Sequence, residues 1–499
     1  MKNIDQTPEE RSLLYQTLSS YIHQYKDVVH THRTHGNAKD IRDAYCLHAL
    51  NHTFKVRDRA LKNTYRISKA EQAGRDPPEC RDQGYTRPKV LILLPFKHSA
   101  YLVIQTLLRL SGLDAKESMA RFQKEFAPEE GADEYDPADF VGAKKPADYL
   151  QTFYGNVDDY FRIGIKFLRK QVRLFANFYS SDIIVASPLG LRNLIKDEGE
   201  KKRDFDFLSS IEVLIADQCD VFGMQNWSHV EHVVNHVNLI PKESHGCDFS
   251  RVRGWYLDGR AKYLRQTLVF SGYPTPEINS LTGPRRCHNV AGQVRFQRFY
   301  PGTIHTLQSQ IRQVFTRVPS KSFLNADDER FAHFTEQVIP GILKSVSGKR
   351  GHVIFVPSYF DFVRVRNYFD AQDLAYAAIS EYSPVSDISR ARTAFFKGDA
   401  DFLVMTERLQ FFRRYHIRGA RHIHFYQLPE RADFYPEVVE WLIATEPGKD
   451  KVRDGAEGQV MGHVTVTYLR WDRLRLERVV GSRRLERLLE GEKGTFMFV

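Results

Sequence analysis

The sequence predicts an α/β fold: an N-terminal helical segment followed by two tandem, doubly wound parallel-sheet lobes. Short apolar runs bounded by Pro, Gly or Asp recur with helix-like segments between them, which is typical of parallel βαβ units. This pattern restarts after a stretch rich in Gly, Pro and Arg. A chain of 499 residues is also too long for one hydrophobic core, so at least two domains are expected.

The first predicted region, residues 1–75, is helical and amphipathic from about residue 8. Leu14, Leu18 and Ile22 illustrate its apolar spacing of three and four residues. A polar stretch with prolines, residues 73–88, then separates this region from the first lobe.

The first lobe is predicted over residues 76–283 and the second over residues 284–499, with an interdomain joint at 282–286. We expect eight strands that are buried in the two sheets, and a charged amphipathic helix at 473–489. The expected strands are 90–96, 182–188, 211–217, 266–272, 352–358, 401–407, 420–426 and 463–469.

Composition favours a partner with many negative charges. The chain has 72 Lys and Arg against 62 Asp and Glu, a formal charge of +10, which suits RNA, DNA or an acidic protein without choosing among them. Its five cysteines include no CxxC pair, which argues against a zinc ribbon and favours a reducing compartment. The polar start and the lack of a long apolar stretch lead us to expect a soluble, intracellular protein without a membrane partner.

The motifs at the strand ends resemble the two RecA-like lobes of superfamily-two RNA helicases. Residues 93–97 take the place of the Pro-Thr-Arg strand end of DEAD-box helicases, and residues 186–192 resemble their ATPGR segment. Residues 271–273 match Ser-Ala-Thr. The DEAD tetrapeptide corresponds to Asp217, Gln218, Cys219 and Asp220. The resemblance implies two RecA-like lobes in tandem.

Several longer segments carry a more specific resemblance, among them IRDAYCLHALNH, RDQGYTRPKVLILLPF and RGWYLDGRAKYLRQTLVFSGYPTPEINSL. They resemble the digestive-organ-expansion-factor family, whose members are also called U3 small nucleolar RNA-associated protein 25. The resemblance implies a component of the small-subunit processome in the nucleolus, which acts in 18S ribosomal RNA processing. It implies pre-ribosomal RNA, the U3 ribonucleoprotein and processome proteins as partners. We further expect a monomer within a large ribonucleoprotein, with no cofactor and no small-molecule substrate.

Three parts that ATP hydrolysis needs are altered or missing. No GxxxxGK[ST] loop, which would cradle the phosphates, occurs upstream of Val90. Gln218 replaces the glutamate that polarises the attacking water, and glutamine cannot accept a proton at neutral pH. Residues 431–437, which correspond to the arginine-finger segment, contain a single arginine. We therefore predict a DEAD-box-like pseudohelicase that is not an enzyme.

Two other functions stay open: a divergent but active ATP-dependent RNA helicase, and a scaffold that binds only proteins. For Asp217 and Asp220 we favour capping of the next helix over metal binding, because a lone aspartate without phosphates is a poor magnesium site.

Candidate residues for RNA or partner binding lie on two kinds of segment. Residues 161–175 are predicted to form a helix whose cations alternate with apolar residues. Loops after the strands of both lobes offer backbone N–H groups and cations. The candidates are Lys97, His98, Ser187, Gly190, Arg192, Arg162, Lys166, Arg169, Lys170, Arg173, Arg413 and Arg414.

Two histidine clusters invite a functional hypothesis. His232 and His236 have the i,i+4 spacing of zinc ligands, but no third ligand is indicated, so we favour an ordinary helix surface without metal. The segment 30–35, which holds three histidines and Arg33, could contact RNA phosphate, but we favour a solvated turn.

Overall fold

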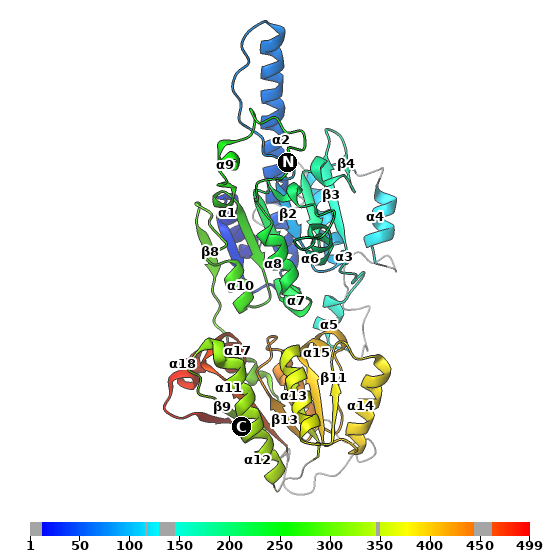
Figure 1. Cartoon of the computed structure of the whole chain (residues 1–499), viewed down its shortest axis with the longest axis vertical. Coiled ribbons are helices and arrows are strands. Elements are labelled where there is room, and N and C mark those ends of the chain that lie inside the picture. The colour runs from blue at the N-terminus through cyan, green and yellow to red at the C-terminus, as the bar shows by residue number, and fades with distance from the viewer. Residues whose placement is uncertain (1–11, 115–117, 129–144, 346–349, 444–461) are drawn as a thin grey trace. The chain divides into compact units, whose positions relative to one another are not determined.

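The computed structural model describes residues 12–114, 118–128, 145–345, 350–443 and 462–499. The chain divides into two compact units, Met1–Arg298 and Phe299–Val499. Each unit has a mostly parallel sheet with helices packed on it (Figure 1). The predicted α/β fold with two lobes is confirmed. Residues 8–11 of the predicted first helix lie outside the described residues.

Unit 1 contains one sheet of eight strands in the order β4-β3-β5-β2-β6-β7-β1-β8. All neighbours are parallel except β3, which is antiparallel to β5 and β4. The strands are β1 (Asp27–His30), β2 (Val90–Leu93), β3 (Arg162–Phe167), β4 (Val172–Arg173), β5 (Ile183–Ala186), β6 (Val213–Ala216), β7 (Gln266–Phe270) and β8 (Gln293–Phe296). The α-helices are α1 (Leu13–His23), α2 (Ala38–Gln72), α3 (Lys97–Ser111), α4 (Met119–Phe126), α5 (Ala147–Thr152), α6 (Pro188–Ile195), α7 (Cys219–Met224), α8 (Trp227–Asn235), α9 (Gly254–Leu257) and α10 (Pro276–Leu281).

The continuous apolar runs of unit 1 form strands because helices cover both faces of the sheet. Side chains alternate along β2, so Val90 and Ile92 pack with residues of α1, α2, α3 and α4 in one core. Leu91 and Leu93 pack with residues of α6, α7, α8 and α10 on the other face. Burial on both faces removes the polar alternation that a half-exposed strand would show.

The N-terminal region is part of the first sheet, which differs from the predicted helical segment. β1 lies between β7 and β8 and pairs with both in parallel, while the Asp27 carboxylate accepts a hydrogen bond from the backbone N–H of Thr267 at 2.7 Å. Its pairing with β1 also places β8 in unit 1. The boundary between the two units along the chain therefore falls after residue 298, later than the predicted joint at 282–286. The sequence does not predict β1 because only Val28 and Val29 of its four residues are apolar, so it forms no apolar run.

The long helix α2 has two halves with different surroundings. Its buried residues run from Ile41 to Thr53, and none follows them. In Figure 1 the second half of α2 extends beyond the sheet of unit 1. The buried half holds His48, whose Nε2 lies 2.7 Å from the Gln266 Oε1. Gln266 in turn donates its amide N–H groups to the carbonyls of Ile22 and Lys26.

Unit 2 contains one sheet of seven strands in the order β11-β12-β10-β13-β14-β9-β15, in which only β15 is antiparallel to its neighbour. The strands are β9 (Arg312–Arg317), β10 (His352–Val356), β11 (Tyr376–Ile379), β12 (Phe402–Thr406), β13 (His422–Phe425), β14 (His463–Tyr468) and β15 (Thr495–Phe498). The α-helices are α11 (Ala326–His333), α12 (Ile339–Lys344), α13 (Tyr359–Ala371), α14 (Val385–Lys397), α15 (Glu407–Arg413), α16 (Phe434–Val439), α17 (Arg473–Val480) and α18 (Ser482–Glu490). All eight predicted strands are present in the two units.

The predicted helix at 473–489 is two helices, α17 and α18, which Gly481 separates. Gly481 has φ 92°, and a Cβ there would lie 2.4 Å from the carbonyl oxygen of Pro301. Only glycine fits this position, so the helix breaks there despite its continuous amphipathic pattern.

A buried ion pair links α11 to the start of α17. Arg330 donates two hydrogen bonds to the Asp472 carboxylate, at 2.9 and 3.1 Å, and both side chains are nearly inaccessible to solvent. Burial alone would raise the pKa of Asp472, but the adjacent Arg330 outweighs it and holds the pKa below its usual range. The pair therefore stays charged inside unit 2.

None of the described helices has the length and apolarity required to cross a lipid bilayer.

Replacing Arg330 with alanine should lower the free energy of unfolding of unit 2 by about 3–5 kcal/mol, because Asp472 would lose its paired cation while staying buried. Urea unfolding of the full chain measures this loss. Arg473→Ala is the matched control: it breaks the exposed pair with Glu486 and should cost less than about 1 kcal/mol. Equal losses in the two variants would contradict a stabilising role for the buried pair.

Unit 1 should lose stability as the pH falls below 6.5. Burial, followed by the nearby His52, lowers the pKa of His48 to about 3, and burial lowers the pKa of His30 to about 4. The unfolded chain therefore binds protons that the folded chain does not, and the free energy of unfolding falls by about 1.4 kcal/mol per pH unit for each such histidine. Urea unfolding between about pH 7 and pH 4 measures the slope, and His48→Gln should reduce it by the share of one proton.

Candidate functional site

The motif segments of unit 1 meet at one edge of its sheet. β1, β2, β5, β6 and β7 run parallel to one another, so the segments after them lie at the same edge, where α/β sheets usually bind ligands. These segments are 31–35, 94–98, 187–192, 217–220 and 271–273.

At this edge the Asp217 carboxylate is bound by groups of the same unit. The Arg33 Nε lies 2.6 Å from Oδ1, and the Tyr45 hydroxyl donates to Oδ2 at 3.2 Å. Burial and then the Asp217 charge raise the pKa of Tyr45 well above 10, so its hydroxyl keeps its proton. The acid that the helicase resemblance aligns with a magnesium-binding residue is therefore neutralised by an internal arginine.

The two residues that flank Cys219 in the tetrapeptide are also fixed by hydrogen bonds. Gln218 adopts the left-handed conformation, with φ 62° and ψ 44°, and donates its side-chain amide to the Ser99 hydroxyl at 2.8 Å. The Asp220 carboxylate accepts the backbone N–H of Gly272 at 2.9 Å. Neither aspartate caps α7, whose N-cap is Gln218 without a side-chain hydrogen bond; capping was the wrong structural role for them.

The predicted solvated turn at residues 30–35 is wrong for its first half. His30 is the last residue of β1 and is buried, whereas His35 is exposed. The backbone N–H of Arg33 donates to the Ser271 carbonyl at 2.8 Å. This bond holds the segment beside the end of β7, from which the Arg33 side chain reaches Asp217.

The start of α3 is closed by a neighbouring segment of unit 1. The backbone N–H groups of Lys97 and His98 donate to the carbonyls of Asp158 and Asn156, both at 2.9 Å. The Lys97 Nζ also lies 2.6 Å from the Asp158 carboxylate. The backbone N–H groups of Lys97 and His98, two predicted RNA contacts, are therefore already hydrogen-bonded within the chain.

The start of α6 is closed in a similar way. Ser187 is buried and accepts the backbone N–H of Gly190 at 3.0 Å, while the Phe161 carbonyl accepts the N–H of Ser187 at 3.1 Å. A Cβ on Gly190 would lie 2.2 Å from that same carbonyl. Ser187 and Gly190 are thus packing and capping residues, and neighbouring Arg192 forms an ion pair with Asp197.

Residues 161–175 form β3 and β4, so the predicted cationic helix is wrong. The alternation of apolar and charged residues here has the strand period of two, with Ile163, Ile165 and Phe167 buried. Among the candidate cations of this segment Lys166 is half-buried. The exposed ones are Arg162, Arg169, Lys170 and Arg173.

In unit 2 the two predicted arginines after β12 have different positions. Arg413 ends α15 and is exposed, whereas Arg414 is buried. The Arg414 Nε lies 2.7 Å from the Glu437 carboxylate, and its guanidinium lies over the Phe434 ring. Arg414 is therefore part of the interior, which corrects its assignment as a surface contact.

His232 and His236 lie on or next to α8, where their rings are 4.6 Å apart. His236 uses one ring nitrogen toward the His232 carbonyl and the other toward Arg203. Among the residues that the structure describes, no group of three or more metal-ligating side chains is arranged to hold an ion.

Two family models match nearly the whole chain. "UTP25, NTP hydrolase-like domain" matches residues 25–294, and "Utp25, C-terminal domain" matches residues 303–498. The chain belongs to the U3 small nucleolar RNA-associated protein 25 family. The two matched ranges follow the two compact units, so the family description covers both sheets.

Relatives in this family align along almost the full sequence. The U3 small nucleolar RNA-associated protein 25 of Schizosaccharomyces japonicus is 44% identical over 97% of this chain and 72% of its own length. The proteins of Sclerotinia sclerotiorum and Schizosaccharomyces pombe are each 43% identical over 97% of this chain, which spans 66% and 71% of their lengths. These relatives are therefore longer than the chain.

Two solved structures align along most of the chain at low identity. A hypothetical ATP-dependent RNA helicase from Sulfolobus tokodaii has 13% identity over 91% of both chains, with a TM-score of 0.27. A DEAD box protein from Methanococcus jannaschii has 13% identity over 96% of this chain and 91% of its own, with the same TM-score. The fold assignment rests on the sheet orders of the two units.

Two features of the site had no recognisable signal in the sequence. Arg33 is far from Asp217 along the chain, and only the pairing of β1 with β7 brings them together. The contact of residues 156–158 with the start of α3 uses backbone carbonyls, which carry no side-chain signature.

Replacing Arg33 with alanine should lower the free energy of unfolding by about 3 kcal/mol, because a buried carboxylate would lose its cation. Adding Asp217→Asn to the Arg33→Ala variant should lower the free energy of unfolding only slightly further, because the asparagine amide carries no charge that needs a partner. Urea unfolding of both single variants and of the double variant forms the cycle. Strictly additive losses would mean that Arg33 and Asp217 are not energetically coupled.

Proposed function

We propose that the chain is a non-catalytic, helicase-like component of the small-subunit processome that acts in U3-dependent 18S ribosomal RNA processing. Relatives with 43–44% identity are named U3 small nucleolar RNA-associated protein 25. The name supports association with the U3 ribonucleoprotein, a role in small-subunit biogenesis and a place in the nucleolus.

The observation that carries the non-catalytic part is the ion pair between Arg33 and Asp217. Magnesium-dependent phosphoryl transfer needs a carboxylate that is free to face the metal and a loop that wraps the phosphates. Here the carboxylate is held by Arg33 at 2.6 Å and by Tyr45 at 3.2 Å, and no GxxxxGK[ST] loop precedes β2. Gln218, in the place of the water-polarising glutamate, is engaged with Ser99.

Binding is the function left for the two units. The net charge of +10 favours a polyanion such as pre-ribosomal RNA, and Arg169 and Lys170 are exposed cations. RNA contacts of this kind go to phosphate and sugar and are independent of base sequence. Processome proteins are the other expected partners. In this proposal the chain binds both and so links these proteins to the pre-ribosomal RNA.

Purified full chain should release no more phosphate from ATP in the presence of RNA than the Asp217→Asn variant does. The reason is that both lack a phosphate-binding loop and a general base. A colorimetric phosphate assay with magnesium measures this release. RNA-stimulated release that Asp217→Asn abolishes would establish the alternative, an active ATP-dependent helicase.

A binding experiment with the same purified protein distinguishes an RNA-binding chain from a scaffold that binds only proteins. The logarithm of the RNA affinity should fall linearly with the logarithm of the salt concentration, since neutralised phosphates release counterions. Fluorescence anisotropy with labelled single-stranded RNA measures the slope. If the chain fails to bind RNA even at low salt, the result establishes the alternative, a scaffold that binds only proteins.

A further inference from the structure

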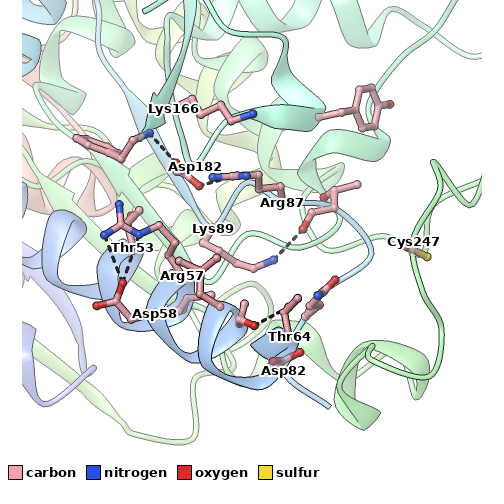
Figure 2. A pocket seen from close by; sticks show the side chains of 18 of the residues that line it. Thr53, Arg57, Asp58, Thr64, Asp82, Arg87, Lys89, Lys166, Asp182 and Cys247 are labelled. Carbon is pink, nitrogen blue, oxygen red and sulfur yellow. Dashed lines mark hydrogen bonds and ion pairs between the residues drawn. The ribbon is translucent and has the colours of Figure 1, made fainter. Parts of the chain in front are cut away.

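A cavity opens at the amino edge of the unit 1 sheet, opposite to the edge that carries the helicase-like motifs. Lys89 and Asp182, which line it, directly precede β2 and β5. Its volume is about 760 Å³, within the range of about 300–1,000 Å³ that is usual for ligand sites. Figure 2 shows α2 along one side, Arg87 and Lys89 in the middle and Cys247 across from them.

One wall is a continuous stripe of α2 where the helix leaves the core. The stripe has helical spacing and consists of Thr53, Val56, Arg57, Ala60, Leu61 and Thr64. Leu61 is 61% exposed, and Tyr65, one turn further on, is 67% exposed. On the other side of the cavity, Phe249, 53% exposed, contacts Tyr85 of the cavity lining. Apolar surface thus continues from the cavity onto the outside of the unit.

The end of β3 and the turn after it supply the positive charge. Among the described residues, Lys166 and Arg169 line the cavity without a carboxylate partner. The acids of the described lining are Asp58, Asp82 and Asp182, and each has a cationic partner. Asp58, beside the stripe of α2, pairs with Arg57 at 3.3 Å. Asp182 pairs with Arg87 at 2.7 Å and accepts the backbone N–H of Phe167. Asp82, also in the lining, pairs with a neighbouring arginine outside it and accepts a side-chain amide from α2. The cavity therefore presents apolar walls with a surplus of cations at the rim.

These surroundings fit a protein segment better than a nucleic acid. Single-stranded RNA is held by bases that stack on free aromatic faces. Here the Tyr179 ring is stacked on His245 at 4.2 Å, and the Tyr85 ring is buried against Tyr256. Within the lining itself the accessible apolar side chains are aliphatic, chiefly Val56 and Leu61, and they suit a Leu or Phe side chain of a peptide; the exposed rings of Tyr65 and Phe249 lie outside it.

We propose that this cavity binds a linear acidic segment of a protein partner. A large apolar side chain inserts between α2 and the turn of β3 and β4, and carboxylates on either side of it meet Lys166 and Arg169. The site lies away from Asp217, so the proposal stands independently of ATP hydrolysis or RNA binding by the chain.

Fluorescence anisotropy of the full chain tests this with fluorescein-labelled peptides in which a Leu-Phe pair is flanked by Glu and Asp. These peptides should bind saturably. The double variant Lys166→Glu with Arg169→Glu should weaken binding by about tenfold or more, as should Leu61→Asp, because charged and apolar anchors dominate such sites. Lys170→Glu is the matched control: it is exposed on the same turn but outside the lining, and it should leave the affinity within about twofold.

Control peptides and RNA complete the design. Peptides with Ser in place of Leu-Phe, or with Lys and Arg flanks, should not bind. The proposal is overturned if the acidic peptides do not bind saturably, or if both cavity variants bind them as wild type does. It is also overturned if labelled poly(U) RNA binds and the same variants abolish its binding, since the cavity would then be an RNA site. Far-UV circular dichroism establishes that the variants are folded. Arg169 is exposed on the turn after β3, whereas Lys166 is half-buried on the strand itself, so the single variant Arg169→Glu decides if either of the other variants unfolds.

Discussion

A buried carboxylate requires a counter-charge, and at Asp217 this requirement determines how the first unit is built. Water cannot solvate a side chain that is 3% exposed, so the cost of burying the charge must be offset by a partner inside the protein. An NTPase would use magnesium and phosphate for this purpose. Here Arg33 does so, and its position after β1 is possible only because β1 is inserted in the sheet next to β7.

The inserted strand explains why the N-terminal region cannot be a separate domain. Asp27 binds the start of β7 through the N–H of Thr267, and Gln266 joins α1, β1 and α2 through Ile22, Lys26 and His48. These contacts fix β1 at one end, and the Arg33–Asp217 pair fixes it at the other. The segments at the carboxyl edge are then closed by their own neighbours, so this edge serves to hold the unit together.

The sequence predicts the central strands of both sheets but not the strands at or near the sheet edges. The eight predicted runs indicate buried parallel strands because both faces of the sheet are covered, and all eight are present. β1 and β8 have only two apolar residues each, so they form no apolar run. The segment 161–175 predicts a helix because its charges obscure a period of two. The sequence predicts that the motif segments follow strands, and the structure places them at one edge of the sheet, but the partners of Asp217 depend on tertiary pairing that no local pattern encodes.

The second half of α2 has a further consequence. Helices of this length gain most of their stability from packing, and an unpacked end opens and closes readily. Beyond Thr53 no residue of α2 is buried, so its amide protons should exchange with solvent in a gradient, slowly near the core and quickly toward Gln72. A molecule that binds to this half of α2 would slow the exchange of its amide protons. Hydrogen exchange of α2 therefore measures whether a partner is bound there.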